Sequence, residues 1–383
     1  MGIRPPDRDE RTLLARWRRG RLVLDRRCGG NRADAFGDRL PDHQDAVESG
    51  DPHTQLVALR RTEPCFFLSV AACSVHAVPV IQAQNLTKKF GDFTAVDGIS
   101  FEVAPGESFG LLGPNGAGKS TTMRMIGGTS LRTSGSLTVL GLDPEERGPE
   151  VRASLGVVPQ QDSLDEELRA RDNLIVYGRY FGLPRAYLET KADELLEFAQ
   201  LTEKAKAKVN ALSGGMKRRL TIARGLVNEP RILLLDEPTT GLDPQARHIL
   251  WDRLFRLKEQ GVTLVITTHF MDEAEQLCDR LVVIDHGKIV AEGSPQALIR
   301  EYSTREVVEV RFGSARNAAM EAELRGMAER IEVLPDRILL YARDGEGLLE
   351  QISRRGLNPL TSLVRRSSLE DVFLRLTGRS LID

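Results

Sequence analysis

The stretch that decides the fold runs from position 113 to position 121: Gly113, Pro114, Asn115, Gly116, Ala117, Gly118, Lys119, Ser120 and Thr121. It matches the phosphate-loop pattern in full, with a predicted strand before it, Ser108–Leu112, and a predicted helix that begins near Lys119. A simple glycine-rich turn would not need both flanking elements. Glycines let backbone N–H groups converge on phosphates, and the helix N-terminus adds a favourable dipole. We therefore expect Lys119 to reach the β- and γ-phosphates of a nucleotide and the Ser120 hydroxyl to ligate Mg²⁺.

Two acids end an apolar run further along the chain. Ile232–Leu235 reads as a buried strand, and Asp236 and Glu237 follow it directly. Taken alone, they could be two solvated acids at a strand end. Together with a phosphate loop, the pattern places Asp236 on the Mg²⁺ ion and Glu237 beside the attacking water, as the general base.

The flanking sequence predicts an α/β fold of the phosphate-loop NTPase type. Leu264–Thr267 is a second run of the kind buried in a parallel sheet, and Gln245–Gln260 supplies the crossover helix that leads to it. Asp285 to Gly287 separate two short strands of a predicted hairpin. Strands are also predicted to begin at Ile81 and to span Ile99–Val103.

Periodicity divides the chain into three parts. Residues 79–302 form the predicted nucleotide-binding domain, with a helical insert at about 163–212, where the pattern from Glu167 to Leu212 is helical. Residues 303–383 read as a small α+β accessory domain. Its predicted elements are a strand at Val307–Phe312, a helix at Ala315–Arg330, a strand at Arg337–Ala342 and a helix that contains Leu369–Leu376.

Residues 1–78 differ from the rest of the chain. They are rich in Arg, Asp, Gly and Pro and contain no Lys, since the first lysine is Lys88. We read them as a poorly ordered leader, or as a translation of upstream sequence with the true start nearer Val78. The apolar stretch Cys65–Ile81 is short for a membrane span and contains His76 and Pro79. Any membrane spans would therefore come from a partner.

Composition excludes several classes of protein. A formal net charge of −2 supplies no field that would attract nucleic acid. The cysteines form no C-x-x-C pair, so the sequence supports neither a disulfide framework nor a zinc site, and it fits a reducing cytoplasm. These cysteines are Cys28, Cys65, Cys73 and Cys278.

The stretch Leu212–Met216 narrows the class of ATPase, because its Ser213, Gly214 and Gly215 resemble the signature loop of ATP-binding cassette (ABC) proteins. A helix with one apolar face begins just after these glycines and would aim its N–H groups at an anion. The resemblance implies that this anion is the γ-phosphate held by a second subunit. Two copies would thus close head-to-tail around two ATP molecules.

The same resemblance assigns four further residues. Phe90 matches the aromatic that stacks on adenine, although a core Phe is the plainer reading. Gln160 matches the glutamine that touches Mg²⁺ and links the ATP site to the helical insert, and its alternative is a surface-loop Gln. Asp243 lies in a loop that matches the one contacting the opposite subunit, or forms a simple turn. His269 matches the histidine that contacts the γ-phosphate and positions water, where a lone His would be structural.

The resemblance covers residues 80–383 and is most specific to exporter ATPases of the drug, polysaccharide and nodulation-factor group. Three stretches resemble the nodulation-factor subgroup, Phe109–Leu112, Tyr177–Gly182 and Thr268–Met271, and the ending Ser368–Arg379 resembles the wider exporter group. It implies an ATPase that powers export of a lipo-chitin oligosaccharide through a separate ABC-2 type permease, on the cytoplasmic face of the bacterial inner membrane. The alternatives are an exporter of drugs, antibiotics, polysaccharides or lipids, an importer ATPase, and a soluble ABC protein without a permease.

Overall fold

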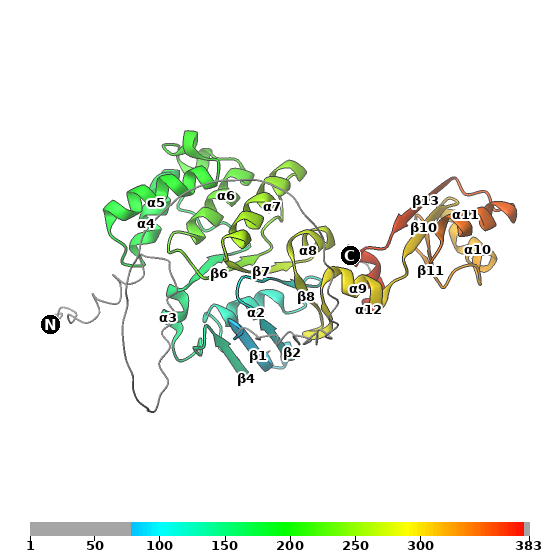
Figure 1. The fold of residues 1–383 in the computed structure, drawn as a ribbon, viewed down its shortest axis with the longest axis horizontal. Helices are drawn as coiled ribbons and strands as arrows, with labels where there is room; N and C mark the ends of the chain where they lie inside the picture. Colours follow the sequence, from blue (N-terminus) through cyan, green and yellow to red (C-terminus); the bar gives the residue numbers. More distant parts are fainter. Residues whose placement is uncertain (1–77, 379–383) are drawn as a thin grey trace, which may run out of the picture. The chain divides into compact units, whose positions relative to one another are not determined.

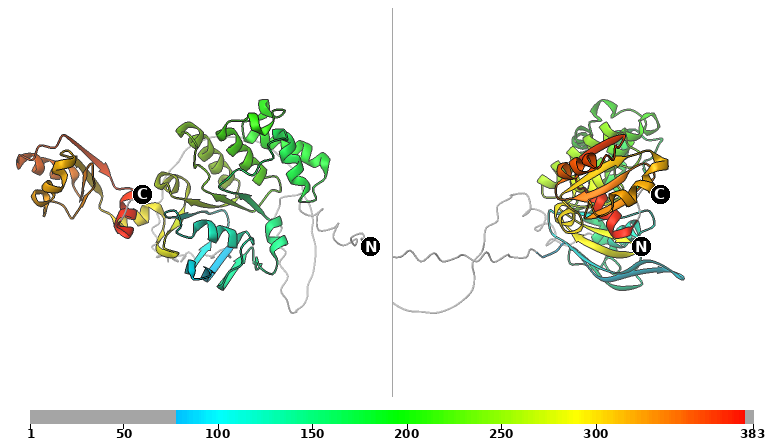
Figure 2. Two further views of the ribbon diagram at one scale, coloured as in Figure 1. Left: turned by 180° about the vertical axis from the view of Figure 1, so that it is seen from behind. Right: turned by 90° about the vertical axis from the view of Figure 1, so that its right-hand side faces the viewer.

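The computed structural model describes residues 78–378. Residues 1–77, which are all but the last residue of the predicted leader and most of the apolar stretch Cys65–Ile81, lie outside these residues. Within them, the predicted α/β phosphate-loop fold is confirmed, and Figures 1 and 2 show a sheet with helices on both faces.

The main sheet has the strand order β5-β6-β7-β3-β8-β9. The first five strands of that order run parallel, and β9 pairs antiparallel with β8 in the predicted hairpin. Every residue of β3 and β7 is buried, which explains their continuous apolar or β-branched sequences. The carboxyl ends of β3, β6 and β7 therefore meet at one edge of the sheet, where their loops begin. The strands are β3 (Ser108–Leu112), β5 (Leu155–Val158), β6 (Ile232–Asp236), β7 (Thr263–Thr268), β8 (Arg280–Asp285) and β9 (Lys288–Gly293).

A second, antiparallel sheet has the order β2-β1-β4. It shares one apolar core with the inner side of the main sheet and with helix α2. Its strands β1 and β2 are longer than the sequence pattern indicated, because they pair with one another from Ile81 to the turn that joins Phe90 to Phe93. The elements of this region are β1 (Ile81–Phe90), β2 (Phe93–Val103), β4 (Ser134–Val139), α2 (Lys119–Ile126) and α3 (Gly148–Ala153).

The opposite side of the main sheet carries the helical region predicted between Glu167 and Leu212. Its helices bury Leu, Ala and Val side chains in one cluster with α6 and α7. Helix α7 is the predicted crossover between β6 and β7. The elements are α4 (Ala170–Arg179), α5 (Arg185–Phe198), two single-turn 3₁₀ helices (Thr202–Lys204 and Val209–Ala211), α6 (Gly214–Gly225), α7 (Pro244–Glu259) and α8 (Met271–Leu277).

The C-terminal region contains a four-stranded antiparallel sheet of order β11-β12-β10-β13. Two predicted strands and the last helix are present, but β11, β13 and α11 were not predicted. The predicted helix over Ala315–Arg330 ends at Leu324, because Gly326 turns the chain at φ +78° and β11 begins at Arg330. The elements are α9 (Pro295–Tyr302), β10 (Glu306–Arg311), α10 (Ser314–Leu324), β11 (Arg330–Val333), β12 (Ile338–Ala342), α11 (Gly345–Arg354), β13 (Thr361–Arg366) and α12 (Leu369–Thr377).

Helix α12 contacts both the C-terminal sheet and the nucleotide-binding part of the chain. Its residues Val372 and Phe373 lie in an apolar cluster with α8, α9 and strand β8. The Leu369 N–H donates to the Glu275 carboxylate of α8 at 2.6 Å. On its other side, Leu374 packs with β10 and β12. The last helix thus joins two apolar cores.

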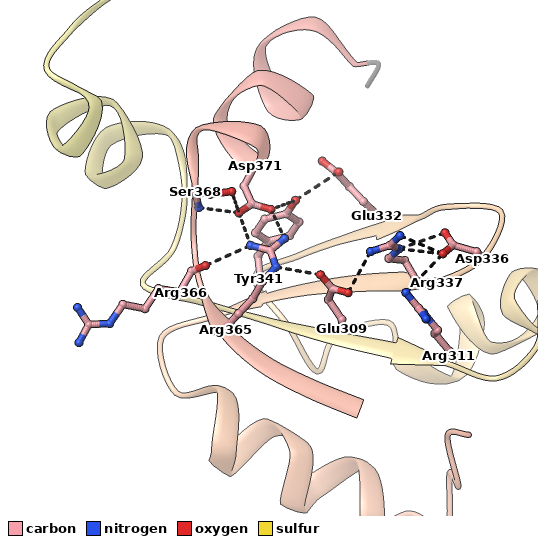
Figure 3. A network of polar contacts seen from close by, with 10 residues as sticks. All are labelled: Glu309, Arg311, Glu332, Asp336, Arg337, Tyr341, Arg365, Arg366, Ser368 and Asp371. Carbon is pink, nitrogen blue, oxygen red and sulfur yellow. Dashed lines mark hydrogen bonds and ion pairs between the residues drawn. The ribbon is translucent and has the colours of Figure 1, made fainter. Parts of the chain in front are cut away.

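A buried ion network holds α12 against the sheet (Figure 3). Asp371 has no exposed surface and accepts from both Arg365 terminal nitrogens, at 2.7 and 2.9 Å, and from the Ser368 N–H at 2.8 Å. The Tyr341 hydroxyl donates to the same carboxylate at 3.1 Å. Burial by itself would raise the pKa of Asp371, but Arg365 and the Ser368 N–H outweigh it and hold that pKa below its ordinary value. Asp371 is therefore ionised and forms part of a capping box at the start of α12.

Truncating Phe373 to Ala should destabilise the protein by about 3–5 kcal/mol, because the ring is 1% exposed and its removal leaves a cavity between α12 and α8. Urea unfolding followed by circular dichroism measures the change. Leu363→Ala is the control, since Leu363 is 55% exposed and should cost no more than about 0.5 kcal/mol. Equal costs for the two variants would show that α12 is not part of the core.

Asp371→Asn should destabilise the protein by about 2 kcal/mol at neutral pH, because Arg365 loses a buried ionic partner. A carboxyl whose pKa is lowered by folding contributes stability above its unfolded pKa of about 3.9 and loses it as the pH falls through the folded value. The difference between the two proteins should therefore shrink on acidification below about pH 4. Urea midpoints measured from pH 7 to pH 3 test this, and a difference independent of pH would contradict it.

Candidate nucleotide site

The phosphate loop joins the buried strand β3 to helix α2, and two of its glycines have no room for a side chain. A Cβ on Gly113 would lie 2.2 Å from the Ile284 carbonyl oxygen, and one on Gly118, at φ +107°, would lie 2.4 Å from the Ala95 carbonyl oxygen. Only glycine lets the loop pass so close to β2 and β8. The loop is therefore fixed by the strands around it before any ligand binds.

Lys119 turns back over this loop from the first turn of α2. The side chain is 4% exposed, and its Nζ donates to the carbonyl oxygens of Gly113, at 2.7 Å, and Pro114, at 3.0 Å. Burial lowers the pKa of Lys119, while the negative charges of Glu237 and Asp236 act in the opposite direction. The amine thus lies inside the loop that the sequence predicts to surround phosphates.

The two acids at the end of β6 reach this loop from the neighbouring part of the sheet. The Ser120 hydroxyl donates to Asp236 Oδ1 at 3.0 Å, and the Thr267 hydroxyl of β7 donates to the same oxygen. A hydroxyl and a carboxylate therefore meet where the sequence predicts a Mg²⁺ ion. Hard oxygen donors of this kind suit that ion. Residues 78–378 contain no cluster of three or more His, Cys, Asp or Glu side chains that could form a different metal site.

Glu237 has an unusual backbone and an unusual environment. Its φ of +46° lies in the left-handed region, which non-glycine residues adopt at some cost in energy. Its N–H is held by the Thr267 carbonyl and hydroxyl oxygens, at 3.1 and 3.0 Å. The side chain, on a residue only 6% exposed, is consequently aimed at the phosphate loop and away from solvent.

Four side chains surround the Glu237 carboxylate. Gln160 Nε2 donates to it at 2.9 Å and the Thr240 hydroxyl donates at 3.2 Å, while His269 Nδ1 lies at 3.2 Å and Lys119 Nζ at 3.8 Å. The approach of His269 has the largest effect and lowers the pKa of Glu237. Burial acts in the opposite direction, and Lys119 and Thr240 add smaller lowering effects, so that the pKa lies below its ordinary value. Glu237 is therefore ionised at neutral pH and able to accept a proton.

A cavity of about 620 Å³ unites these groups. Phe90 and Phe93 line one side of it, and Phe90 is 52% exposed, so Phe90 is not a core side chain. The cavity is lined also by the predicted residues Asn115, Gly116, Gly118, Lys119, Ser120, Thr121, Gln160, Glu237 and His269. Its size matches that of pockets for small organic ligands.

The predicted signature residues do not face this cavity. Ser213, Gly214 and Gly215 line a separate pocket of about 390 Å³ together with Asp243. Ser213 caps α6, with its hydroxyl accepting from the Met216 N–H at 3.4 Å, and Asp243 caps α7 by accepting from the Ala246 N–H at 2.8 Å. Two helix N-termini therefore border one pocket, and backbone N–H groups of this kind favour an anion.

Arg218 is a site residue that the sequence did not reveal. It is 3% exposed, and its guanidinium donates to carbonyl oxygens on both sides of the site: Pro159 at 2.6 Å, beside Gln160, and Asp236 and Glu237 at 3.0 and 3.1 Å. One planar side chain thereby fixes the loop of Gln160 relative to the two acids. Arg218 lies in a Lys-Arg-Arg run that reads as a solvated helix face, so the sequence contains no signal for this contact.

In the part of the chain that the structure describes, no helix is long and apolar enough to cross a membrane.

Comparisons with known proteins agree with this geometry. The profile of the ABC transporter family matches residues 96–240, and that of the nodulation factor export protein NodI, C-terminal domain, matches residues 317–378. Among solved structures, an ATP-binding subunit of an ABC transporter has 29% identity and a TM-score of 0.54, and covers 58% of this chain and 93% of its own. A dimeric cassette in a post-hydrolysis state with ADP and phosphate has 30% identity and a TM-score of 0.51, and covers 56% of this chain and 98% of its own.

Curated relatives match over most of the chain. The Nod factor export ATP-binding protein I of Rhizobium sp. (strain N33) is 50% identical over 301 residues, which are 79% of this chain and 98% of that protein. Its counterpart from Rhizobium meliloti is 48% identical over 333 residues, which are 85% of this chain and 98% of that protein. The chain is an ABC transporter ATPase that binds ATP, and it belongs to the family of the Nod factor export ATP-binding proteins.

Proposed function

We propose that this protein hydrolyses ATP to power export of a lipo-chitin oligosaccharide of the nodulation-factor type through a separate permease. The observation that carries the ATPase assignment is the convergence of two distant segments: Lys119 and Ser120 line one cavity with Glu237, and Ser120 donates to the neighbouring Asp236. The names of the relatives support the proposed cargo, because those proteins are about half identical to this chain and are matched over 98% of their own length.

Each site residue has a role in this proposal. The backbone from Gly113 to Thr121 and the Lys119 amine hold the phosphates, and Phe90 stacks on the adenine. Ser120, Asp236 and Gln160 are the proposed ligands of Mg²⁺, which when bound would neutralise phosphate charge.

The proton transfer falls to Glu237. Its ionised carboxylate takes a proton from the attacking water as the water's oxygen bonds to the γ-phosphorus and the bond from that phosphorus to the leaving oxygen of ADP breaks. His269, 3.2 Å from the carboxylate, orients the base and the water. Gln160 donates to the same carboxylate at 2.9 Å, so a movement of its loop would change the position of the base.

The separate signature pocket supports a head-to-tail dimer. Ser213, Gly214, Gly215 and Asp243 border no part of the cavity that contains Lys119, so we propose that they meet the nucleotide of a second copy. The dimeric cassette with ADP and phosphate is a related precedent. In this scheme ATP binding favours the closed dimer, and hydrolysis opens it.

The helical region offers a surface for an ABC-2 type permease on the cytoplasmic face of the inner membrane. Pro159, next to Gln160, borders a groove of about 410 Å³ together with Val176 and Tyr180 of the α4 region. Val176 is 41% exposed and Tyr180 is 82% exposed. Exposed apolar and aromatic side chains beside a groove are typical of interaction sites. We propose that the permease docks here, on the helical insert at residues 163–212. In the domain division that we propose, this insert belongs to a nucleotide-binding domain of residues 79–302, and residues 303–383 form the accessory domain.

Glu237→Gln should reduce ATP turnover about 100-fold or more while leaving ATP binding nearly unchanged, because the amide cannot accept the proton but keeps the side-chain shape. Phosphate release and equilibrium binding of labelled ATP measure the two quantities. Glu259→Gln, an exposed position at the end of α7, is the matched control. Near-normal turnover in Glu237→Gln would refute the assignment of the base.

The partner is tested by a pull-down of the Glu237→Gln protein from native membranes with ATP present. We expect a protein with several membrane spans in the eluate, and we expect Tyr180→Asp added to this protein to reduce its recovery about tenfold by placing a charge in the interface. Leu131→Asp, at another exposed position, is the control and should retain the partner.

The other outcomes of the pull-down distinguish the alternatives. Ribosomal proteins or nucleic acid without a membrane protein would favour a soluble ABC protein. Recovery of a permease identified with drugs, antibiotics, lipids or other polysaccharides would keep the motor and change the cargo. Transport into inverted membrane vesicles distinguishes an exporter from an importer.

A further inference from the structure

Four arginines gather at one end of the C-terminal sheet. Glu306, the first residue of β10, pairs with Ala342 at the end of β12 and with Arg366 at the end of β13. The neighbours Arg305 and Arg343 therefore lie at the same end as Arg366. Arg300, in the last turn of α9, completes the group and comes from the helix that precedes the sheet.

These arginines line one pocket of about 600 Å³. Its floor includes Ser367, which is 9% exposed and accepts a hydrogen bond from the Ser303 hydroxyl at 3.0 Å. The pocket shares no residue with the nucleotide cavity or the signature pocket. It is therefore a distinct site, and nothing in the ATPase mechanism uses it.

The carboxylates near the pocket leave it positive. Glu329 also lines the pocket and pairs with Arg343 at 2.9 Å, and Glu306 lies 3.5 Å from Arg305 while accepting from the Gly345 N–H. Within residues 78–378, Arg300 and Arg366 have no carboxylate within ion-pair distance. Four arginines and two carboxylates thus leave an excess of two positive charges at the pocket.

The side chains of the adjacent residues Arg365 and Arg366 point in different directions. Arg365 is bound to Glu309 and Asp371, whereas the Arg366 side chain points away from that network (Figure 3). At the end of α9, the Tyr302 carbonyl oxygen accepts a hydrogen bond from Arg375 Nη1 at 2.8 Å. The positive charge of Arg375 offsets the negative end of the helix dipole, which therefore does not oppose an anion in the pocket. The Arg366 guanidinium is therefore available to an external partner, and the end of α9 does not repel an anion.

We propose that this pocket binds a phosphate-bearing anion. A planar guanidinium presents paired N–H donors that match phosphate oxygens, and several arginines around one pocket add charge and specificity. The pocket is larger than a single phosphate needs and fits an organic phosphate or a phospholipid headgroup. The site goes beyond the proposed transport function, since it would bind its ligand whether or not a permease is present.

The test uses the full-length Glu237→Gln protein loaded with one equivalent of ATP and freed of excess nucleotide, so that the nucleotide cavity is occupied and no free ATP competes for the pocket. Two probes are compared: inorganic pyrophosphate by isothermal titration, and sedimentation with phosphatidylcholine vesicles with or without phosphatidylglycerol. Arg300→Gln combined with Arg366→Gln removes the two arginines without ion pairs. Arg185→Gln combined with Arg325→Gln removes two exposed arginines elsewhere and keeps the same net charge.

The pocket pair should weaken binding of at least one probe by about 100-fold, roughly tenfold per arginine, while the control pair changes it little. Both pairs should bind ATP as the parent does. Loss of pyrophosphate binding identifies a free phosphate compound as the ligand, and loss confined to phosphatidylglycerol vesicles identifies a lipid headgroup. The proposal is overturned if neither probe binds the parent, or if both pairs weaken binding equally, since that would show only general electrostatic attraction.

Discussion

The parallel arrangement of β3, β7 and β6 is the constraint on which the site depends. Because these strands are buried and hydrogen-bonded side by side, their carboxyl ends lie at one edge, and each end delivers part of the site. The phosphate loop follows β3, the two acids lie at the end of β6, and Thr267 and His269 come from the end of β7. No single loop brings these groups together, and a shift of one strand would separate them.

Glu237 shows how that constraint is used. Its left-handed backbone is held by two bonds to Thr267, and its carboxylate is held by Gln160, Thr240 and His269. The strain is stored where the surrounding structure determines the conformation, as is common at functional sites. Arg218 extends the same arrangement by bonding to backbone carbonyls of both loops, so that the site is rigid on one side and connected to the helical region on the other.

The sequence predicted those features that depend on local pattern. The phosphate loop, the acids after an apolar strand and the helical region are encoded in short stretches, because chemistry and backbone geometry there require particular residue types. The fold class followed from the same stretches. Arg218 was missed because its burial results from two distant loops that meet over α6. The strands β11 and β13 were missed because they are short and largely intermediate or exposed, with no clean alternation.

Contacts between distant segments could not be predicted from the sequence either. The structure brings Gln160 to Glu237 although they are 77 positions apart in the sequence, and nothing in the local sequence determines that contact. The division of the tail from the nucleotide-binding part was drawn by composition and periodicity, which cannot show that α12 returns to pack on α8 and α9.

That return has a consequence for engineering and for evolution. Helix α12 contributes side chains to two apolar cores. The C-terminal sheet therefore cannot be exchanged without disturbing the nucleotide-binding part of the chain. A chimera that takes its tail from a relative would have to take the matching surfaces of α8 and α9 as well. Recombination within this family should therefore tolerate breakpoints between α9 and α12 poorly.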